Sequence, residues 1–385
     1  MVAVLLAIDA CSLAKKYSSA TKGRVTTSRM LLSAVAAAVS IYMILLPTVD
    51  WIISSNTPPS SGVLEEMSSS EWVRLKTMEV FFAVWFFAVG ASIGSFLNVV
   101  AYRLPRRESL VFRSSKCPHC GVQIQSRDNV PLLGWLKLGG RCRNCAAPIS
   151  MRYPIVEAVT GGAFLVLYFV ELISGGSNLP VRQPNAYAGV VWILMYTKWD
   201  LVGLYLFHCA VLCTLLSWGL IRVDDHRVPL GSIFSATAVV MGTICCFPGL
   251  VIVPWRAEVP PLLQEIPYAQ VLCTAGIGWL AGLLSGAAVL AVVAWRKETS
   301  ARLPSLEFAA GFGLVGLAWG WQSVFLIAIF TAMLQQVLRT EELRKIFQVP
   351  CPPEISLPIV AYLNLLGWRV VSELPAQAWQ YFSAL

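Results

Sequence analysis

Residues 80–102 read VFFAVWFFAVGASIGSFLNVVAY, a run without a single Asp, Glu, Lys or Arg. A helix needs about 20 mostly apolar residues to cross the hydrocarbon core of a bilayer. This run is long enough to do so, and Arg103 follows it directly. We therefore predict a membrane-spanning helix that ends at Arg103, at a membrane surface.

The composition of the whole chain agrees with this interpretation. The chain has 385 residues, of which 57% are hydrophobic and only 13% are charged, about half the charged fraction of an ordinary soluble domain. Only helices and closed barrels satisfy their backbone groups in lipid, so the predicted fold class is an all-α polytopic membrane protein with about eight transmembrane helices. The other candidate spans cover, approximately, residues 30–53, 154–173, 201–221, 232–253, 271–295, 307–334 and a short 355–371.

The positive charge of the chain is concentrated in one segment. Ten basic and two acidic side chains lie between Arg103 and Arg152, so this segment accounts for the whole formal net charge of +8. Loops rich in Lys and Arg remain on the cytoplasmic side of a membrane and contact anionic lipid. The loop is therefore predicted to be cytoplasmic, facing inner-membrane lipid, and nucleic acid is not an expected partner.

This basic loop contains two Cys-x-x-Cys pairs, Cys117-Pro-His-Cys120 and Cys142-Arg-Asn-Cys145, with 21 residues between them. Four thiolates brought together by two tight turns form a tetrahedral shell that suits zinc. Such a shell has no open position for water, so the zinc is expected to be structural. Two disulfides would be the alternative, but a cytoplasmic loop is in a reducing compartment.

The surroundings of the cysteines lead to two further expectations. Lys116, Arg141 and Arg143 lie next to the cysteines, and positive neighbours lower the pKa of a thiol. His119 lies inside the first pair, and it is expected to be a solvent-facing turn residue because four sulfurs already complete the shell.

The sequence around this loop resembles a known family. Several segments carry the resemblance: Gly94-Ser-Phe-Leu-Asn-Val-Val-Ala-Tyr-Arg-Leu-Pro105, the two cysteine pairs, Asp128-Asn-Val-Pro131, Gly134-Trp135 and Pro148-Ile-Ser-Met-Arg-Tyr-Pro-Ile-Val-Glu157. Together they are similar to the N-terminal domain of prepilin peptidases, the type IV leader peptidases. The close resemblance covers residues 85–161. A looser one continues to the end of the chain, with Gly320-Trp-Gln322 as its clearest point.

The resemblance suggests three regions. Residues 1–75 would be an N-terminal extension with one extra transmembrane helix and an external loop. Residues 76–173 would be the prepilin peptidase N-terminal domain, including the zinc loop 104–153. Residues 174–385 would be a divergent, membrane-embedded, peptidase-like helical domain.

The resemblance also implies an activity. Prepilin peptidases are aspartic-type endopeptidases of the bacterial inner membrane that cleave the leader from type IV prepilins and pseudopilins at the cytoplasmic face. Many also methylate the new N-terminus with S-adenosylmethionine, which would then be a second cofactor beside structural zinc. Prepilins or pseudopilins would be the substrates, and the oligomeric state stays open.

The catalytic carboxylates are harder to place. An aspartic protease holds a water between two carboxyl groups, one ionised and one protonated. The first would come from Asp224 or Asp225, which precede Pro229, although Arg222 stands where an ungapped comparison places the first catalytic Asp. No Asp follows Asp225, so Glu307 is the candidate for the second. Each also has a simpler interpretation as a polar residue at a helix end.

Three functions therefore remain open on sequence alone. The chain is an active, divergent prepilin peptidase, or a catalytically inactive relative that acts as a membrane scaffold or prepilin-binding accessory, or a relative with methyltransferase activity only. Two further ionisable residues lie in apolar runs, Glu157 and His208. Glu157 belongs to the matched segment, and His208 is expected to make a hydrogen bond between packed helices.

Overall fold

The computed structural model describes residues 69–111, 114–180, 182, 189–253, 268–295, 306–338 and 353–372. The predicted span 30–53, and with it almost all of the N-terminal extension, lies outside these residues.

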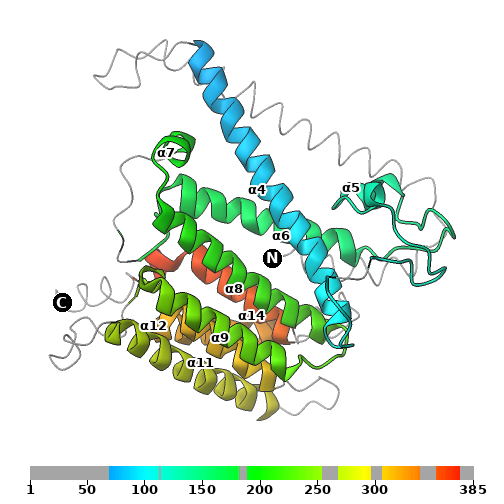
Figure 1. Cartoon of the computed structure of the whole chain (residues 1–385). Helices are drawn as coiled ribbons and strands as arrows, with labels where there is room; N and C mark the ends of the chain where they lie inside the picture. The colour runs from blue at the N-terminus through cyan, green and yellow to red at the C-terminus, as the bar shows by residue number, and fades with distance from the viewer. Residues whose placement is uncertain are drawn as a thin grey trace.

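The described residues form a helical bundle (Figure 1). Five helices are long and apolar enough to cross a membrane, at Arg74–Arg103, Arg152–Ile173, Trp199–Val223, Ala269–Val292 and Leu306–Leu338. Two shorter apolar helices accompany them, at Leu230–Cys246 and Glu354–Leu366. The predicted all-α membrane fold is confirmed, and no named strand occurs within the described ranges.

The helical elements of the described residues are numbered in chain order. Their bounds are α4 (Ser69–Arg103), η2 (Ser126–Asp128), α5 (Leu133–Lys137), α6 (Arg152–Leu167), the π-helix η3 (Tyr168–Ile173), α7 (Val190–Met195), α8 (Trp199–Val223), α9 (Leu230–Cys246), η4 (Pro248–Leu250), α11 (Ala269–Trp295), α12 (Leu306–Leu338) and α14 (Pro353–Leu366).

Two predicted spans differ in detail from the structure. The run 232–253 is helical only as far as Cys246, because Pro248 follows and opens the separate turn η4. Proline disfavours helical backbone in the residue before it, and Phe247 indeed has an extended φ of −129°. The run 307–334 is one helix, α12, but its backbone is non-helical at Gly320, where φ is +81°.

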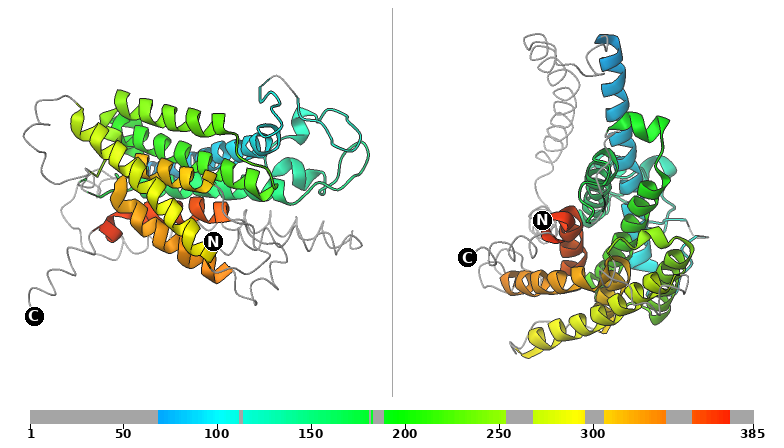
Figure 2. Two further views of the ribbon diagram at one scale, coloured as in Figure 1. Left: turned by 90° about the horizontal axis from the view of Figure 1, so that it is seen from below. Right: turned by 90° about the vertical axis from the view of Figure 1, so that its left-hand side faces the viewer.

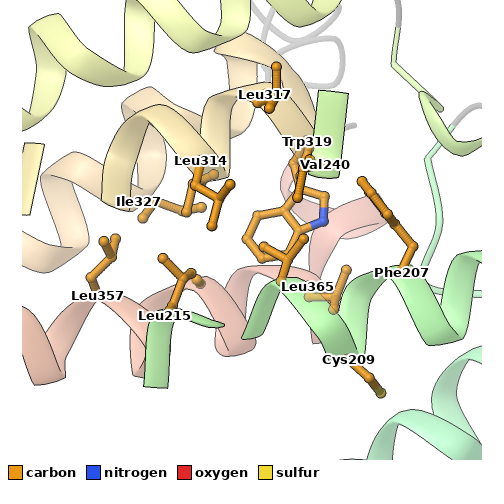
Figure 3. Packing of buried hydrophobic residues seen from close by; sticks show 14 of the residues in the cluster. Phe207, Cys209, Leu215, Val240, Leu314, Leu317, Trp319, Ile327, Leu357 and Leu365 are labelled. Carbon is orange, nitrogen blue, oxygen red and sulfur yellow. The ribbon is translucent and has the colours of Figure 1, made fainter. Parts of the chain in front are cut away.

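The core of the bundle surrounds the indole of Trp319, which is 1% exposed. Figure 3 shows the side chains that lie around it, which come from α8, α9, α12 and α14. Because Gly320 interrupts α12 immediately after Trp319, the helix changes direction at the centre of this cluster. The other labelled members of this buried cluster are Phe207, Cys209, Leu215, Val240, Leu314, Leu317, Ile327, Leu357 and Leu365.

Helices α11 and α12 touch through their backbones. A Cβ atom at Gly278 would lie 2.0 Å from the carbonyl oxygen of Gly316, and one at Gly282 would lie 2.1 Å from that of Phe312. Small residues four apart allow membrane helices to approach this closely, which gains van der Waals contact where no hydrophobic force between helices is available. The glycines therefore fix the spacing of this pair.

The basic loop emerges at one end of the bundle. It joins α4 to α6, and Figure 2 shows it projecting beyond the ends of the helices. Arg103, the last residue of α4, donates from its guanidinium to the carbonyl oxygens of Ser109 (3.1 Å) and Ser114 (3.3 Å). The end of the span thus holds the start of the loop.

Candidate functional site

The four cysteines of the loop lie together. The sulfur atoms of Cys117, Cys120, Cys142 and Cys145 all lie within 4.8 Å of one another. The Sγ atoms of Cys117 and Cys145 are 3.8 Å apart, which is about the separation of two ligands in a tetrahedral Zn–S shell with bonds of about 2.3 Å. The donor set and its dimensions fit zinc, and they leave no ligand position for water.

Each pair is held by the same backbone turn. In the first, Gly121 N–H donates to Cys117 O and Cys117 N–H donates to Val122 O, both at 2.9 Å. In the second, Ala146 N–H donates to Cys142 O at 3.0 Å and Cys142 N–H donates to Ala147 O at 2.8 Å. A single antiparallel bridge closes each turn, which gives the short hairpins that a four-cysteine site needs.

The backbone of the turns favours the thiolate at two of the four cysteines. At Cys145 the backbone N–H of Ala147 acts in the same direction, but burial and the three neighbouring thiols raise the pKa to about 11. The backbone N–H groups of Cys145 and Asn144 lower the pKa of Cys142 to about 6, and the backbone N–H of Val122 lowers that of Cys120. The lowered pKa values of Cys120 and Cys142 come mainly from these backbone N–H groups. Of the three basic neighbours that were expected to contribute, Arg143 pairs with Asp128. His119 is exposed, as expected of a turn residue.

Two carboxylates tie the loop together and to the membrane helices. Asp128 accepts two hydrogen bonds of 2.6 Å from the guanidinium of Arg143, which holds the pKa of Asp128 below its usual range. Glu157, on α6, accepts a 2.7 Å hydrogen bond from the N–H of Leu132, whose φ is +60°. A positive φ is unfavourable for leucine, so Glu157 holds the loop in a conformation that it would not adopt unaided.

The first candidate carboxylate, Asp224, forms an ion pair. It is the C-cap residue of α8, and its Oδ1 accepts a short hydrogen bond from Nη1 of Arg152, the first residue of α6. Arg152 follows the second cysteine turn closely in the sequence. The end of α8 is thereby connected to the base of the metal loop.

Asp225 has a different position. It follows the C-cap with a φ of +62°, its N–H donates to Arg222 O, and the N–H of His226 donates to Ile221 O. These two bonds define a Schellman motif, in which the left-handed residue is usually glycine. Asp225 is therefore the residue that terminates α8.

The third candidate, Glu307, lies in the first turn of α12 and lines a small crevice. Glu354, in the first turn of α14, lines the same crevice, and neither Asp224 nor Asp225 does so. The crevice encloses about 10 Å³, the space of about one water molecule. Its other walls are Leu215, Trp218, Val228, Phe308, Gly311 and Leu357.

Glu354 was not identified from the sequence. Its Oε1 accepts a 3.0 Å hydrogen bond from Nε of Arg222, in the last turn of α8, and its side chain is 5% exposed. The signal that could have found it is an acidic residue at the start of a short apolar run, which alone predicts only a helix N-terminus.

A second missed carboxylate lies deeper in the bundle. Glu171, in the π-helix η3, is fully buried and lies 2.8 Å from Nδ1 of His208 on α8. The hydrogen bond between packed helices that the sequence led us to expect for His208 is thus present. Asn178 also donates to Glu171, at 3.5 Å.

Fold and site together define a class: a multi-pass helical membrane protein with a four-cysteine metal loop, beside which several carboxylates gather at the ends of membrane helices. Comparison with known proteins narrows this class. Residues 88–170 match the model of the bacterial peptidase A24 N-terminal domain. No solved structure matches.

Curated relatives extend the match. The chain is 36% identical over 217 residues to the type 4 prepilin-like proteins leader peptide-processing enzyme of Escherichia coli O78:H11, covering 51% of this chain and 76% of that protein. It is 28% identical over 289 residues to the prepilin leader peptidase/N-methyltransferase of Pectobacterium carotovorum, covering 62% and 95%. Identity reaches 52% over 83 residues with the Myxococcus xanthus protein of that name, where the match covers 22% of this chain and only 25% of the relative.

This chain belongs to the prepilin leader peptidase family. The Escherichia coli match is longer than the 88–170 segment, so the relationship extends beyond the metal-loop domain.

Proposed function

We propose that this chain is a prepilin leader peptidase of the bacterial inner membrane, which cleaves type IV prepilins or pseudopilins at the cytoplasmic face. The observation that carries the proposal is the length of the family match, which covers 76% of the Escherichia coli enzyme and 95% of the Pectobacterium one. A chain that had kept only the metal-loop domain would match over that domain alone. The methyltransferase-only alternative, which would retain the N-terminal half, is less favoured for this reason, and the names of the relatives do not favour the inactive alternative.

The proposed orientation places the metal loop and the carboxylates on the cytoplasmic side. The excess of basic residues in the loop supports this orientation, and Arg152 brings the loop and the end of α8 to the same side of the bundle. In this orientation the carboxylates would lie on the same side of the membrane as the leader of a prepilin. We propose that the chain divides into three regions, with boundaries at residues 75 and 173.

The proposed chemistry uses two carboxyl groups and one water. Glu307 is one of them, and the sequence points to Asp224 or Asp225 for the other. The four thiolates would hold a structural zinc that orders the loop, and no chemical step passes through it. The names of the relatives also support N-methylation with S-adenosylmethionine as a second proposed activity.

The test is cleavage of a prepilin from the same bacterium by membranes that contain the full chain. Cleavage by the parent, and its loss in Glu307→Gln, is the expected result. Asp200→Asn is the matched control, because Asp200 pairs with Arg182 at the opposite end of α8. An intact substrate in the presence of correctly folded, metal-loaded parent would contradict the proposal, and transfer of labelled methyl groups would then identify the methyltransferase-only alternative.

A further inference from the structure

The crevice at the cytoplasmic end of the bundle is lined by two carboxylates that come from different helices. Glu307 lies in the first turn of α12 and Glu354 in the first turn of α14, and both line the same crevice. We propose that Glu354 is the second catalytic carboxylate, and that Glu307 and Glu354 share the water that cleaves the leader peptide. The inference rests on the proposed peptidase function and names the residue that completes its site.

The helix packing keeps the two glutamates together. The start of α14 packs against Gly219 of α8 through Ile355 and the backbone carbonyl of Glu354. A Cβ atom at Gly219 would lie 3.2 Å from the backbone oxygen of Glu354. One turn further along, Leu357 of α14 packs against Gly311 of α12, where a Cβ atom would lie 2.8 Å from Leu357 Cδ2. The starts of α12 and α14 are thus held against α8 and against each other.

The size of the crevice matches its proposed content. At about 10 Å³ it holds about one water and no larger group. A buried water needs several polar partners, and the two carboxylates supply acceptor oxygens among walls that are otherwise mainly apolar. An attacking water bound between two carboxyl groups is the arrangement that acid–base peptide hydrolysis requires.

Charge assigns a role to each glutamate. The guanidinium of Arg222 lies 3.0 Å from Glu354 Oε1 and compensates a negative charge there, so Glu354 is the ionised base. In such a pair one carboxyl group must carry a proton, and the proposal gives that role to Glu307. Glu354 stands in the first turn of α14, where the helix dipole also favours its ionised form.

The reaction then balances as follows. Glu354 takes a proton from the water while the water oxygen bonds to the scissile carbonyl carbon, and Glu307 gives its proton to the carbonyl oxygen. In the collapse of the resulting diol, the C–N bond breaks, the leaving amine takes the proton from Glu354, and a hydroxyl proton returns to Glu307. The products are a carboxylic acid and an amine, and both glutamates return to their starting forms.

Asp224 and Asp225 are less suited to this role in the observed structure. Asp224 is engaged by Arg152, Asp225 occupies the left-handed position that ends α8, and neither lines the crevice. Asp224 is therefore assigned to hold the metal loop against α8, as a structural rather than a catalytic residue.

The experiment compares isosteric variants of the full chain in membranes, with the prepilin cleavage rate as the readout. Glu354→Gln keeps an oxygen that can accept from Arg222, so it removes the base with little change in packing. The expected result is a loss of about a hundredfold or more in kcat, with KM near that of the parent and recovery of part of the rate in Glu354→Asp. Asp224→Asn should lose less than Glu354→Gln, and Asp200→Asn should match the parent.

Two outcomes would overturn the inference while leaving the peptidase function in place. One is cleavage by Glu354→Gln within about threefold of the parent, well below the effect of losing a general base. The other is a larger loss in Asp224→Asn than in Glu354→Gln at equal amounts of folded protein, measured by size-exclusion chromatography in detergent. If the parent itself fails to cleave, the proposed function fails first, so the two failures are distinguishable.

Discussion

The two cysteine turns allow a matched test of how backbone conformation affects the stability of the metal loop. They share one backbone geometry, but residue 121 is glycine and residue 146 is alanine, with φ of +69° and +55° respectively. A left-handed conformation costs a residue with a Cβ atom about 1–2 kcal/mol. Exchanging the residue types at the two positions should therefore move the stability of the cluster in opposite directions.

The magnitude follows from two opposing terms. Ala146→Gly relieves about 1–2 kcal/mol of backbone strain, but glycine loses more freedom on folding, by about 0.4–1 kcal/mol. The net gain is about 0.5–1 kcal/mol, and Gly121→Ala should lose a similar amount. No atom lies within 4 Å of a Cβ built at Gly121, so a steric clash does not contribute to the loss.

The assay is metal affinity. Because metal binding and folding of such a loop are one process, these energies appear as changes of roughly two- to fivefold in the apparent zinc dissociation constant. The constants can be measured by competition with a chromogenic chelator, using the full chain in detergent. Ala146→Gly should bind zinc more tightly than the parent, and Gly121→Ala more weakly.

Weaker binding by Ala146→Gly, or tighter binding by Gly121→Ala, would refute this reasoning. Either result would mean that residues 121 and 146 do not keep positive φ in the metal-bound protein. An unchanged zinc dissociation constant in both variants would show that the conformation of these two turns does not contribute to zinc binding.

Three further predictions concern the bundle and the loop. Gly278→Ala should sharply reduce the yield of folded protein, because its Cβ atom would lie 2.0 Å from the Gly316 carbonyl oxygen. Gly276→Ala, on the same helix, is the control and should be tolerated, because its Cβ atom has no atom within 4 Å. The amount of folded protein in each variant can be measured by size-exclusion chromatography. Arg143→Met should accelerate zinc release to a chelator, because Asp128 loses both its hydrogen bonds, while Arg141→Met, which leaves that pair intact, should not. Glu157→Leu should lower the free energy of unfolding by about 1–3 kcal/mol, because the Leu132 N–H loses its acceptor. Glu157→Gln retains an acceptor oxygen and should lower the free energy of unfolding by less. The two variants can be compared by their thermal unfolding midpoints, and equal midpoints would contradict the assigned hydrogen bond.

The features that could be predicted from sequence are those that depend on local pattern. A long uncharged run specifies a membrane helix whatever it packs against, which is why α4, α6, α8, α11 and α12 were expected close to their observed positions. The spacing of the two cysteine pairs likewise specifies a four-sulfur cluster, because each tight turn is a local structure.

The partners of the carboxylates could not be predicted, because they depend on tertiary contacts. Arg152 and Asp224 are 72 residues apart in the sequence, and Arg222 and Glu354 are 132 apart. Both pairs form only once the helix ends are assembled. Asp225 shows a related difficulty, since two adjacent aspartates look equivalent in the sequence until the backbone places one of them in the left-handed turn.

The position of Arg222 supports the assignment of Glu354 to the proposed site. Sequence resemblance alone places a catalytic carboxylate at that point of α8, where this chain has an arginine. The structure brings a carboxylate to the same point from another helix, because Glu354 of α14 lies 3.0 Å from Arg222. Arg222 is only 14% exposed, and a charge so largely removed from water needs an opposite charge beside it, which Glu354 supplies. In the proposed site the second carboxylate therefore comes from α14 and lies beside the point of α8 at which the resemblance predicts one.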